Sequence, residues 1–185
     1  MRRFTADELA TFLRAVDGAL NEPATLVVIG GTAIALKYDA RHSTTDVDTT
    51  NLSAPLAIAL ERAREQTGLP VPVQAVGGVV FAPEDYEERL EPVSLGNLAR
   101  LTVFVPEKHD LALMKVSRGL EHDLQGVEEI HKASPLQLET LLERFEQTWV
   151  VGSRRQFAIS LLSALERLFG PETAAAEEDR LMGGP

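Results

Sequence analysis

Two aspartates placed two positions apart are the residues of this sequence that most directly suggest chemistry. Asp46 and Asp48 fall in a segment that we expect to be extended, so their side chains project from the same face. Upstream, the apolar run Thr25–Ile29 ends at Gly30 and Gly31, where a helix is expected to begin. Such a turn lets a phosphate approach the free N–H groups of a helix N-terminus. Paired carboxylates beside it suit Mg²⁺, which predicts metal-assisted phosphoryl or nucleotidyl transfer.

This order of motifs resembles a known signature. Gly30-Gly31 followed by Asp46-x-Asp48 is similar to the nucleotidyltransferase signature of the DNA polymerase β superfamily. The closer resemblance is to its AbiEii-like branch, the nucleotidyltransferase toxins of type IV toxin–antitoxin systems. The residues that carry this closer resemblance are the Gly-Gly-Thr-Ala run from Gly30 to Ala33, together with Arg41, Thr44, Asp46 and Asp48.

Two residues further along the chain extend the resemblance. The AbiEii-like branch has a lysine in a helix and an aspartate shortly after it, and Lys115 and Asp123 hold those places here. The resemblance implies that Lys115 neutralises phosphate charge and that Asp123 completes the active site. A lysine is well suited to developing phosphate charge because its ammonium group is a compact point charge.

The resemblance also implies a ligand set and a reaction. Asp46 and Asp48 would hold Mg²⁺ or Mn²⁺. The implied nucleotide-binding residues are Gly30, Gly31, Thr32, Arg41 and Thr44. The reaction would move a nucleoside monophosphate from an NTP to an acceptor and release pyrophosphate. In this family the acceptor is expected to be RNA, at the 3′ end of tRNA, and a cognate antitoxin protein is the expected partner.

Some features of the sequence depart from the wider superfamily and leave alternatives open. The superfamily places a third carboxylate in a later strand, whereas the predicted strands 71–76, 79–81 and 101–105 contain no acidic residue. In the AbiEii-like branch the helical aspartate does that work, but a second acid that often follows it is replaced here by Gly126. A non-catalytic regulatory or antitoxin-like protein that keeps the fold is therefore an alternative function.

A second alternative reads the aspartates differently. Asp46 to Thr50 also fits Asp-x-Asp-x-Thr, the nucleophile loop of haloacid-dehalogenase-type phosphatases, in which Asp46 would be the nucleophile and Asp48 the acid/base. Such a loop normally follows a strongly apolar strand, whereas residues 41–45 are polar. Gly77-Gly78 reads as a hairpin turn, and the four scattered histidines lack the spacing of a zinc site.

The elements that must position these residues predict an α+β fold. Thr5 and Glu8 form a capping-box pair ahead of a first helix, and Ser53 caps another helix that ends at Gly68. After Pro106 the remaining pattern is helical, and one of the helices is expected to begin at Pro135, with Ser134 as its cap. We therefore expect a nucleotidyltransferase-type mixed sheet with flanking helices over residues 1–105, a C-terminal helical bundle over 106–170 and a disordered tail over 171–185.

Composition sets the outer limits. The 185 residues contain no cysteine, which excludes disulfides, thiolate zinc sites, iron–sulfur clusters and a cysteine nucleophile. The formal charge of −10 argues against broad, charge-driven nucleic-acid binding, so any RNA contact should be local. The N-terminus lacks the apolar core of a signal peptide, and no run of about 18 apolar residues occurs. A cytoplasmic protein without a membrane span is expected.

Overall fold

The computed structural model describes residues 2–76, 81–150 and 152–183. The chain divides into two compact units. The first comprises Met1–Val79 and Glu87–Glu107, and the second comprises Val80–Tyr86 and Lys108–Pro185. The predicted turn at Gly77-Gly78 lies outside the described residues, as does most of the predicted strand 79–81, of which only Phe81 is described and is not in a strand.

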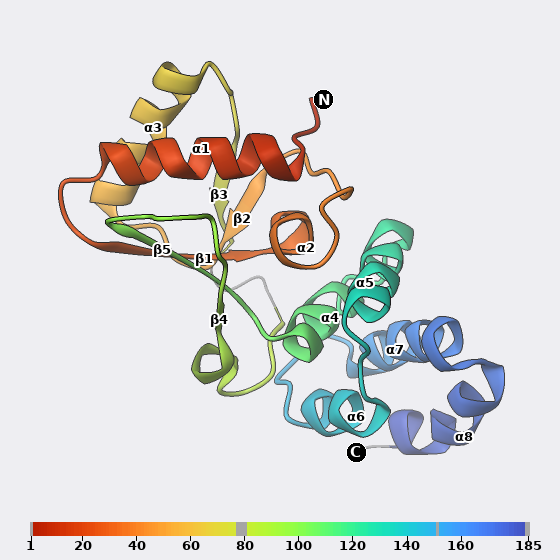
Figure 1. The fold of residues 1–185 in the computed structure, drawn as a ribbon. Coiled ribbons are helices and arrows are strands. Elements are labelled where there is room, and N and C mark those ends of the chain that lie inside the picture. The colour runs from red at the N-terminus through yellow and green to blue at the C-terminus, as the bar shows by residue number, and fades with distance from the viewer. Residues whose placement is uncertain (1, 77–80, 151, 184–185) are drawn as a thin grey trace. The chain divides into compact units, whose positions relative to one another are not determined.

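Within its described residues, the first unit contains a five-stranded mixed sheet (Figure 1). The strands are β1 (Ala24–Ile29), β2 (Val47–Thr49), β3 (Val73–Ala75), β4 (Glu91–Pro92) and β5 (Leu101–Val105), in the order β3-β2-β1-β5-β4. β1 pairs with β5, and β2 with β3, in parallel, whereas β1–β2 and β4–β5 are antiparallel. The helices are α1 (Ala6–Ala19), α2 (Gly30–Lys37) and α3 (Ala54–Thr67), of which α1 and α3 pack together.

Local signals account for most of these boundaries. The predicted capping box is present, because the Thr5 hydroxyl accepts a bond from Glu8 N while Glu8 Oε2 accepts one from Thr5 N at 3.0 Å. Ser53 caps α3, and Gly68 ends it in the left-handed conformation at φ +65°. β1 is buried from Leu26 to Ile29, as its β-branched run predicted.

A buried carboxylate fixes the start of β5 in a way that sequence patterns do not reveal. Asp17, near the end of α1, accepts hydrogen bonds from the backbone N–H groups of Ala99, Arg100 and Leu101 at 3.1, 2.7 and 2.7 Å. Burial by itself would raise the pKa of Asp17, but these three donors outweigh it and hold the pKa below its usual value. The carboxylate thereby ties α1 to the central sheet.

Replacing Asp17 with Ala should lower the free energy of unfolding by about 2–4 kcal/mol, because three backbone donors lose a charged acceptor. The measurement is urea unfolding, with the exposed Asp7→Ala of the same helix as the control. Because the folded-state pKa is depressed, the stabilisation is present above the unfolded-state pKa of about 3.9 and disappears as the pH falls through the folded-state value. Equal losses in the two variants would show that Asp17 does not anchor β5.

The second unit is helical in the residues that are described. Its helices are α4 (Lys108–Val116), α5 (Glu121–Ala133), α6 (Leu138–Glu146), α7 (Arg154–Phe169) and α8 (Pro171–Met182), and a short 3₁₀ turn, η1 (Tyr86–Arg89), spans the junction of the units along the chain. Residues 80–86 belong to this unit because Pro83 forms an antiparallel bridge with Thr148 and Glu84 N donates to Gln147 O at 3.3 Å. The predicted boundary between residues 105 and 106 assigned residues 80–86 to the N-terminal part of the chain.

The start of α6 differs from its prediction for a specific reason. A helix was expected from Pro135, but α6 begins at Leu138 with Gln137 as its N-cap. Gln137 N donates to His109 Nε2 at 2.9 Å, and Lys108 Nζ donates to Pro135 O at 2.7 Å. These two hydrogen bonds with α4 hold residues 135–137 outside α6.

The prediction of a disordered tail is wrong for residues 171–182, which form α8. Pro171 provides a helix-compatible first position, and α8 packs against α7. Ala174 and Leu181, seven residues apart, are buried along one face. Arg180 forms an ion pair with Glu146 of α6 at 2.9 Å. The tail therefore folds through tertiary contacts, although its own sequence has little apolar pattern.

The predicted fold class is confirmed: a mixed sheet with flanking helices is followed by a helical C-terminal region. β4 was not predicted, because a two-residue strand carries no periodic signal. Among the described residues, no helix has the length and apolar character needed to cross a membrane.

Candidate active site

The glycine pair between β1 and α2 makes room for polar side chains. Gly30 has φ +66°, and a β-carbon added to it would lie 3.0 Å from Asp48 Oδ2. A β-carbon on Gly31 would lie 2.8 Å from Thr44 Oγ1 and 3.1 Å from His42 Nε2. The N-cap of α2 is Ile29, whose side chain cannot accept a hydrogen bond. The two glycines thus place an uncapped helix start beside a carboxylate and a hydroxyl.

Gly31→Ala should therefore destabilise the first unit, by about 1–3 kcal/mol, because its β-carbon overlaps Thr44. Gly18→Ala in α1 is the matched control, because nothing lies within 4 Å of the added atom. That variant should be more stable than wild type by up to about 1 kcal/mol. Urea unfolding of the two variants makes the comparison, and a neutral Gly31→Ala would contradict the close approach.

The two aspartates lie where the sequence predicted an extended segment. Asp48 is in β2, paired with Ile29 of β1, and Asp46 immediately precedes the strand. Gln74 of β3 is the Cα partner of Asp48, and its Nε2 atom lies 3.4 Å from Asp46 Oδ2, so the two carboxylates lie on one face. Both residues are partly exposed. They therefore form a carboxylate pair beside the glycine turn.

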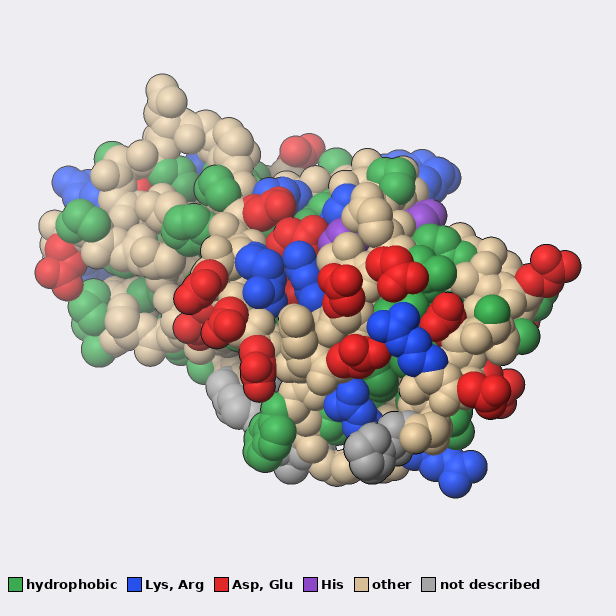
Figure 2. Space-filling model, turned by 90° about the horizontal axis from the view of Figure 1, so that it is seen from below, with side chains coloured by type: hydrophobic (Ala, Val, Ile, Leu, Met, Phe, Trp, Pro, Cys, Tyr) green, Lys and Arg blue, Asp and Glu red, His purple; other side chains and the backbone are tan. Residues whose placement is uncertain are grey.

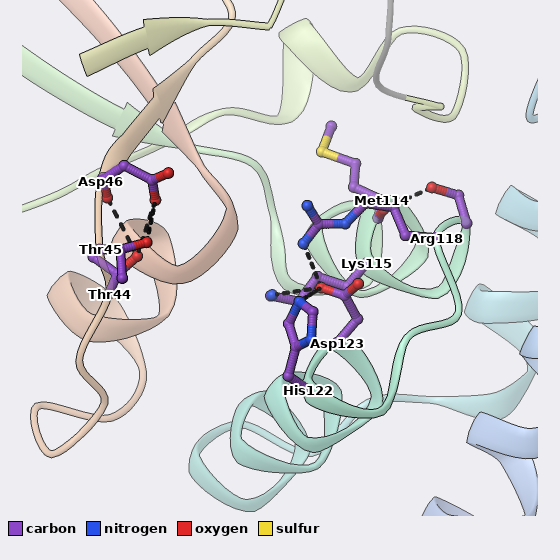
Figure 3. A network of polar contacts seen from close by, with 9 residues as sticks. Thr44, Thr45, Asp46, Met114, Lys115, Arg118, His122 and Asp123 are labelled. Atoms are coloured by element: carbon purple, nitrogen blue, oxygen red, sulfur yellow. Dashed lines mark hydrogen bonds and ion pairs between the residues drawn. The ribbon is translucent and has the colours of Figure 1, made fainter. Parts of the chain in front are cut away.

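Three threonine hydroxyls hold Asp46. Thr32 Oγ1 of α2 donates to the Asp46 carbonyl oxygen at 2.7 Å, and Thr44 Oγ1 donates to the same oxygen at 3.2 Å. Thr44 and Thr45 also reach the Asp46 Oδ1 atom, each at 3.4 Å (Figure 3). Thr32 is only 1% exposed, so its hydroxyl is committed to this backbone contact. The predicted phosphate role of Thr32 and Thr44 stays a prediction, while the structure gives both a positioning contact.

Arg41 is held by a neighbour in the loop before β2. Its guanidinium Nε and Nη2 atoms lie 3.0 Å from the two carboxylate oxygens of Asp39. These bonds, chiefly, lower the pKa of Asp39 to about 2. The Arg41 side chain is largely exposed. Its predicted contact with a nucleotide would require exchange of Asp39 for phosphate.

One strand residue of the site was missed by sequence reasoning. Gln74 of β3 is the register partner of Asp48, and its Nε2 atom lies 3.4 Å from Asp46 Oδ2. The signal that could have found it is that Gln74 is the sole polar residue of the predicted strand Val71–Val76. The strand pairing that gives this residue its meaning depends on residues distant in sequence.

In the second unit, Lys115 and Asp123 form a buried ion pair. Lys115 Nζ of α4 lies 3.2 Å from Asp123 Oδ1 of α5, and the side chains are 5% and 0% exposed. Arg118 donates to the same oxygen, and His122 Nε2 lies 3.7 Å from it (Figure 3). Burial lowers the pKa of Lys115, and the opposing effect of Asp123 does not fully compensate.

The two oxygens of Asp123 have unequal surroundings. Oδ1 accepts hydrogen bonds from Lys115 and Arg118, whereas Oδ2 is buried and has no hydrogen-bond partner among the residues that the structure describes. The predicted lysine and aspartate are thus brought together within the second unit, as the glycines and the aspartate pair are within the first. Their joint action stays a prediction.

The two carboxylates of the first unit could bind a magnesium or manganese ion together with further ligands from a nucleotide. The described residues contain no group of three or more His, Cys, Asp or Glu that could hold a metal by itself. Asp46 and Asp48 supply two hard carboxylate ligands, and Mg²⁺ commonly takes one or two such ligands plus substrate phosphates. The pair therefore fits a cation that arrives with a nucleotide.

A mixed sheet bearing a glycine turn and a carboxylate pair is the arrangement of a nucleotidyltransferase-like fold. Residues 5–164 match a family model described as "Nucleotidyltransferase of unknown function (DUF6036)", and the protein belongs to this family. No curated protein and no solved structure is significantly similar to the chain. The match supports the nucleotidyltransferase family but does not reach the narrower AbiEii-like toxin branch.

Proposed function

We propose that the protein is a Mg²⁺-dependent nucleotidyltransferase that moves a nucleoside monophosphate from an NTP to an acceptor. The observation that supports this most directly is the Gly30-Gly31 turn at the uncapped start of α2, where Gly30 lies against the Asp48 carboxylate and Gly31 against the Thr44 hydroxyl. Family membership over residues 5–164 supports the same class of reaction.

The chain's own groups divide the work. Asp46 and Asp48 would hold Mg²⁺ or Mn²⁺, which when bound would offset negative charge on the transferred phosphoryl group. Backbone N–H groups at the start of α2 would bind the triphosphate, with Gly30 and Gly31 allowing close approach. Thr32 would keep Asp46 in place through its 2.7 Å bond to the carbonyl oxygen.

The proposed reaction is an in-line displacement. An acceptor hydroxyl oxygen forms a bond to the α-phosphorus, the bond from that phosphorus to the pyrophosphate oxygen breaks, and the hydroxyl proton is released. Lys115 would neutralise phosphate charge and Asp123 would complete the active site. Because Lys115 is paired with Asp123, phosphate would replace the carboxylate as its partner.

The proposed acceptor is RNA, at the 3′ end of tRNA, in a toxin-like protein that acts in the cytoplasm with a cognate antitoxin. This finer proposal is supported only by the motif resemblance, which is carried by Gly30–Ala33, Arg41, Thr44, Asp46, Asp48, Lys115 and Asp123. Figure 2 shows acidic and basic side chains intermixed over one face of the molecule, and the chain as a whole carries a formal net charge of −10. RNA contact would therefore be local and would depend on the cation.

The test is incubation of the full chain with each α-labelled NTP, Mg²⁺ and total RNA, followed by gel analysis. Label should enter RNA only when Mg²⁺ or Mn²⁺ is present, and pyrophosphate should appear in equal amount. Binding of NTP without transfer to RNA, protein or small acceptors would favour the non-catalytic regulatory alternative. Phosphate release from an aryl phosphate would favour the phosphatase alternative, although residues 38–46 form turns and a single bridge rather than the apolar strand that alternative needs.

A further inference from the structure

We infer that Gln74 sets the charge of the carboxylate site, so that the protein takes its divalent cation as a cation–nucleotide complex rather than as the free ion. This inference rests on the proposed function. It is carried by the position of Gln74 in β3, which is the neighbour of β2 at one edge of the sheet.

Strand register places Gln74 on the face of the two aspartates. Asp48 and Gln74 are Cα partners across the parallel β2–β3 pair, and partners in a pair project to the same side of a sheet. Asp46, two residues before Asp48, shares that side. The Gln74 Nε2 atom donates toward Asp46 Oδ2 at 3.4 Å, a long bond that nevertheless shows which carboxylate it faces.

An amide at this position has two consequences. The side-chain N–H group of Gln74 orients Asp46 by a hydrogen bond. The side-chain carbonyl oxygen is an uncharged oxygen ligand of the kind that hard cations bind. Among the described residues of the first unit, the carboxylate pair therefore consists of Asp46 and Asp48, and an acidic residue at position 74 would add a third carboxylate. Cation affinity rises with the number of charged ligands, so a two-carboxylate site is a weak binder of the free ion. Nucleotide phosphates would supply the missing negative ligands.

The experiment measures Mn²⁺ binding to the full chain by the loss of the free-ion electron paramagnetic resonance signal, without nucleotide. Gln74→Glu should bind Mn²⁺ at least about tenfold more tightly than wild type, because it adds a third charged ligand. The matched control is Gln66→Glu, which adds the same charge at an exposed position of α3 and should leave the affinity unchanged. Equal affinities of the two variants would overturn the inference.

A second measurement separates cation binding from folding. Without Mn²⁺, Gln74→Glu should melt below wild type because three carboxylates repel one another, and Mn²⁺ should restore the melting temperature. The double variant with Asp48→Asn should lose the gain in Mn²⁺ affinity. If it keeps the gain, Gln74 does not share the cation site.

Failure of this inference is distinguishable from failure of the proposed function. Wild type should bind Mn²⁺ tightly only when a non-hydrolysable NTP analogue is present. Tight binding of the free ion by wild type would overturn the inference and leave the proposed function standing. No binding of Mn²⁺ with the analogue, together with a Gln74→Glu gain, would contradict the proposed function and support the effect of Gln74 on charge.

Discussion

Asp48→Asn should leave the chain folded and lower nucleotidyl transfer by about a thousandfold or more. The change removes one of two charges that would hold the cation, while the amide keeps the shape that packs beside Gly30. The same loss is expected for Asp46→Asn. The rate of label transfer and the urea midpoint should be measured on the same preparations, so that activity loss and unfolding are separated.

The exposed Asp7→Asn of α1 is the matched control, and it should retain wild-type transfer. Addition of Mn²⁺ in place of Mg²⁺ should recover part of the activity of Asp48→Asn, because a softer ion tolerates a neutral ligand better. Full activity of a folded Asp48→Asn variant would show that this carboxylate does not take part in catalysis and would leave Asp46 without its proposed partner.

The elements that the sequence predicts well are those with local physical causes. The capping box at Thr5 and the Ser53 cap depend on residues within one helical turn, so their chemistry is visible in a short window. The glycine pair is similar, since a left-handed residue such as Gly30 disfavours other side chains. Such local features allowed the sequence to predict the strand, glycine turn and helix that position the candidate site.

What the sequence could not predict depends on residues far apart in the chain. In the sequence, Asp17 looks like an ordinary acidic residue of a helix. Its role depends on the hydrogen bonds from the start of β5, some 80 residues later in the chain. α8 has few large apolar side chains, and it is ordered by the packing of Leu181 and by the Arg180–Glu146 ion pair. Partner choice in a sheet is likewise non-local, so the relation between Gln74 and Asp48 emerges only from the register.

The site itself shows the same division. Motif resemblance selected Gly30, Gly31, Asp46 and Asp48, and the structure places the carboxylate of Asp48 against Gly30. Resemblance also predicted phosphate contact for Thr32, whereas the buried hydroxyl of that residue donates to the Asp46 backbone. The structure thus gives Thr32 a positioning contact, and its phosphate contact stays a prediction.

Lys115→Met should reduce transfer by about a hundredfold while changing the free energy of unfolding by no more than about 1 kcal/mol. If Lys115 has its proposed role, the variant loses a positive charge that would neutralise phosphate, and this loss accounts for the expected fall in transfer. Two opposing effects act on the free energy of unfolding. Loss of the ion pair with Lys115 lowers it, although Asp123 keeps its ion pair with Arg118, and removal of the cost of burying the Lys115 ammonium group raises it. Lys132→Met on the exposed side of α5 is the control for both measurements.

The depressed pKa of Lys115 gives this prediction a pH signature. Below the folded-state pKa, wild type carries the full cost of a buried charge, and above it the unfolded chain binds more protons than the folded one. Wild-type stability should therefore rise relative to Lys115→Met as the pH increases toward the unfolded-state pKa of about 10.4. Asp123→Ala provides the opposite case, with a loss of about 3–5 kcal/mol, because Lys115 and Arg118 would then lose the carboxylate that pairs with both of them. Similar losses in Lys115→Met and Asp123→Ala, flat with pH, would mean that the ion pair acts only as a structural link between α4 and α5.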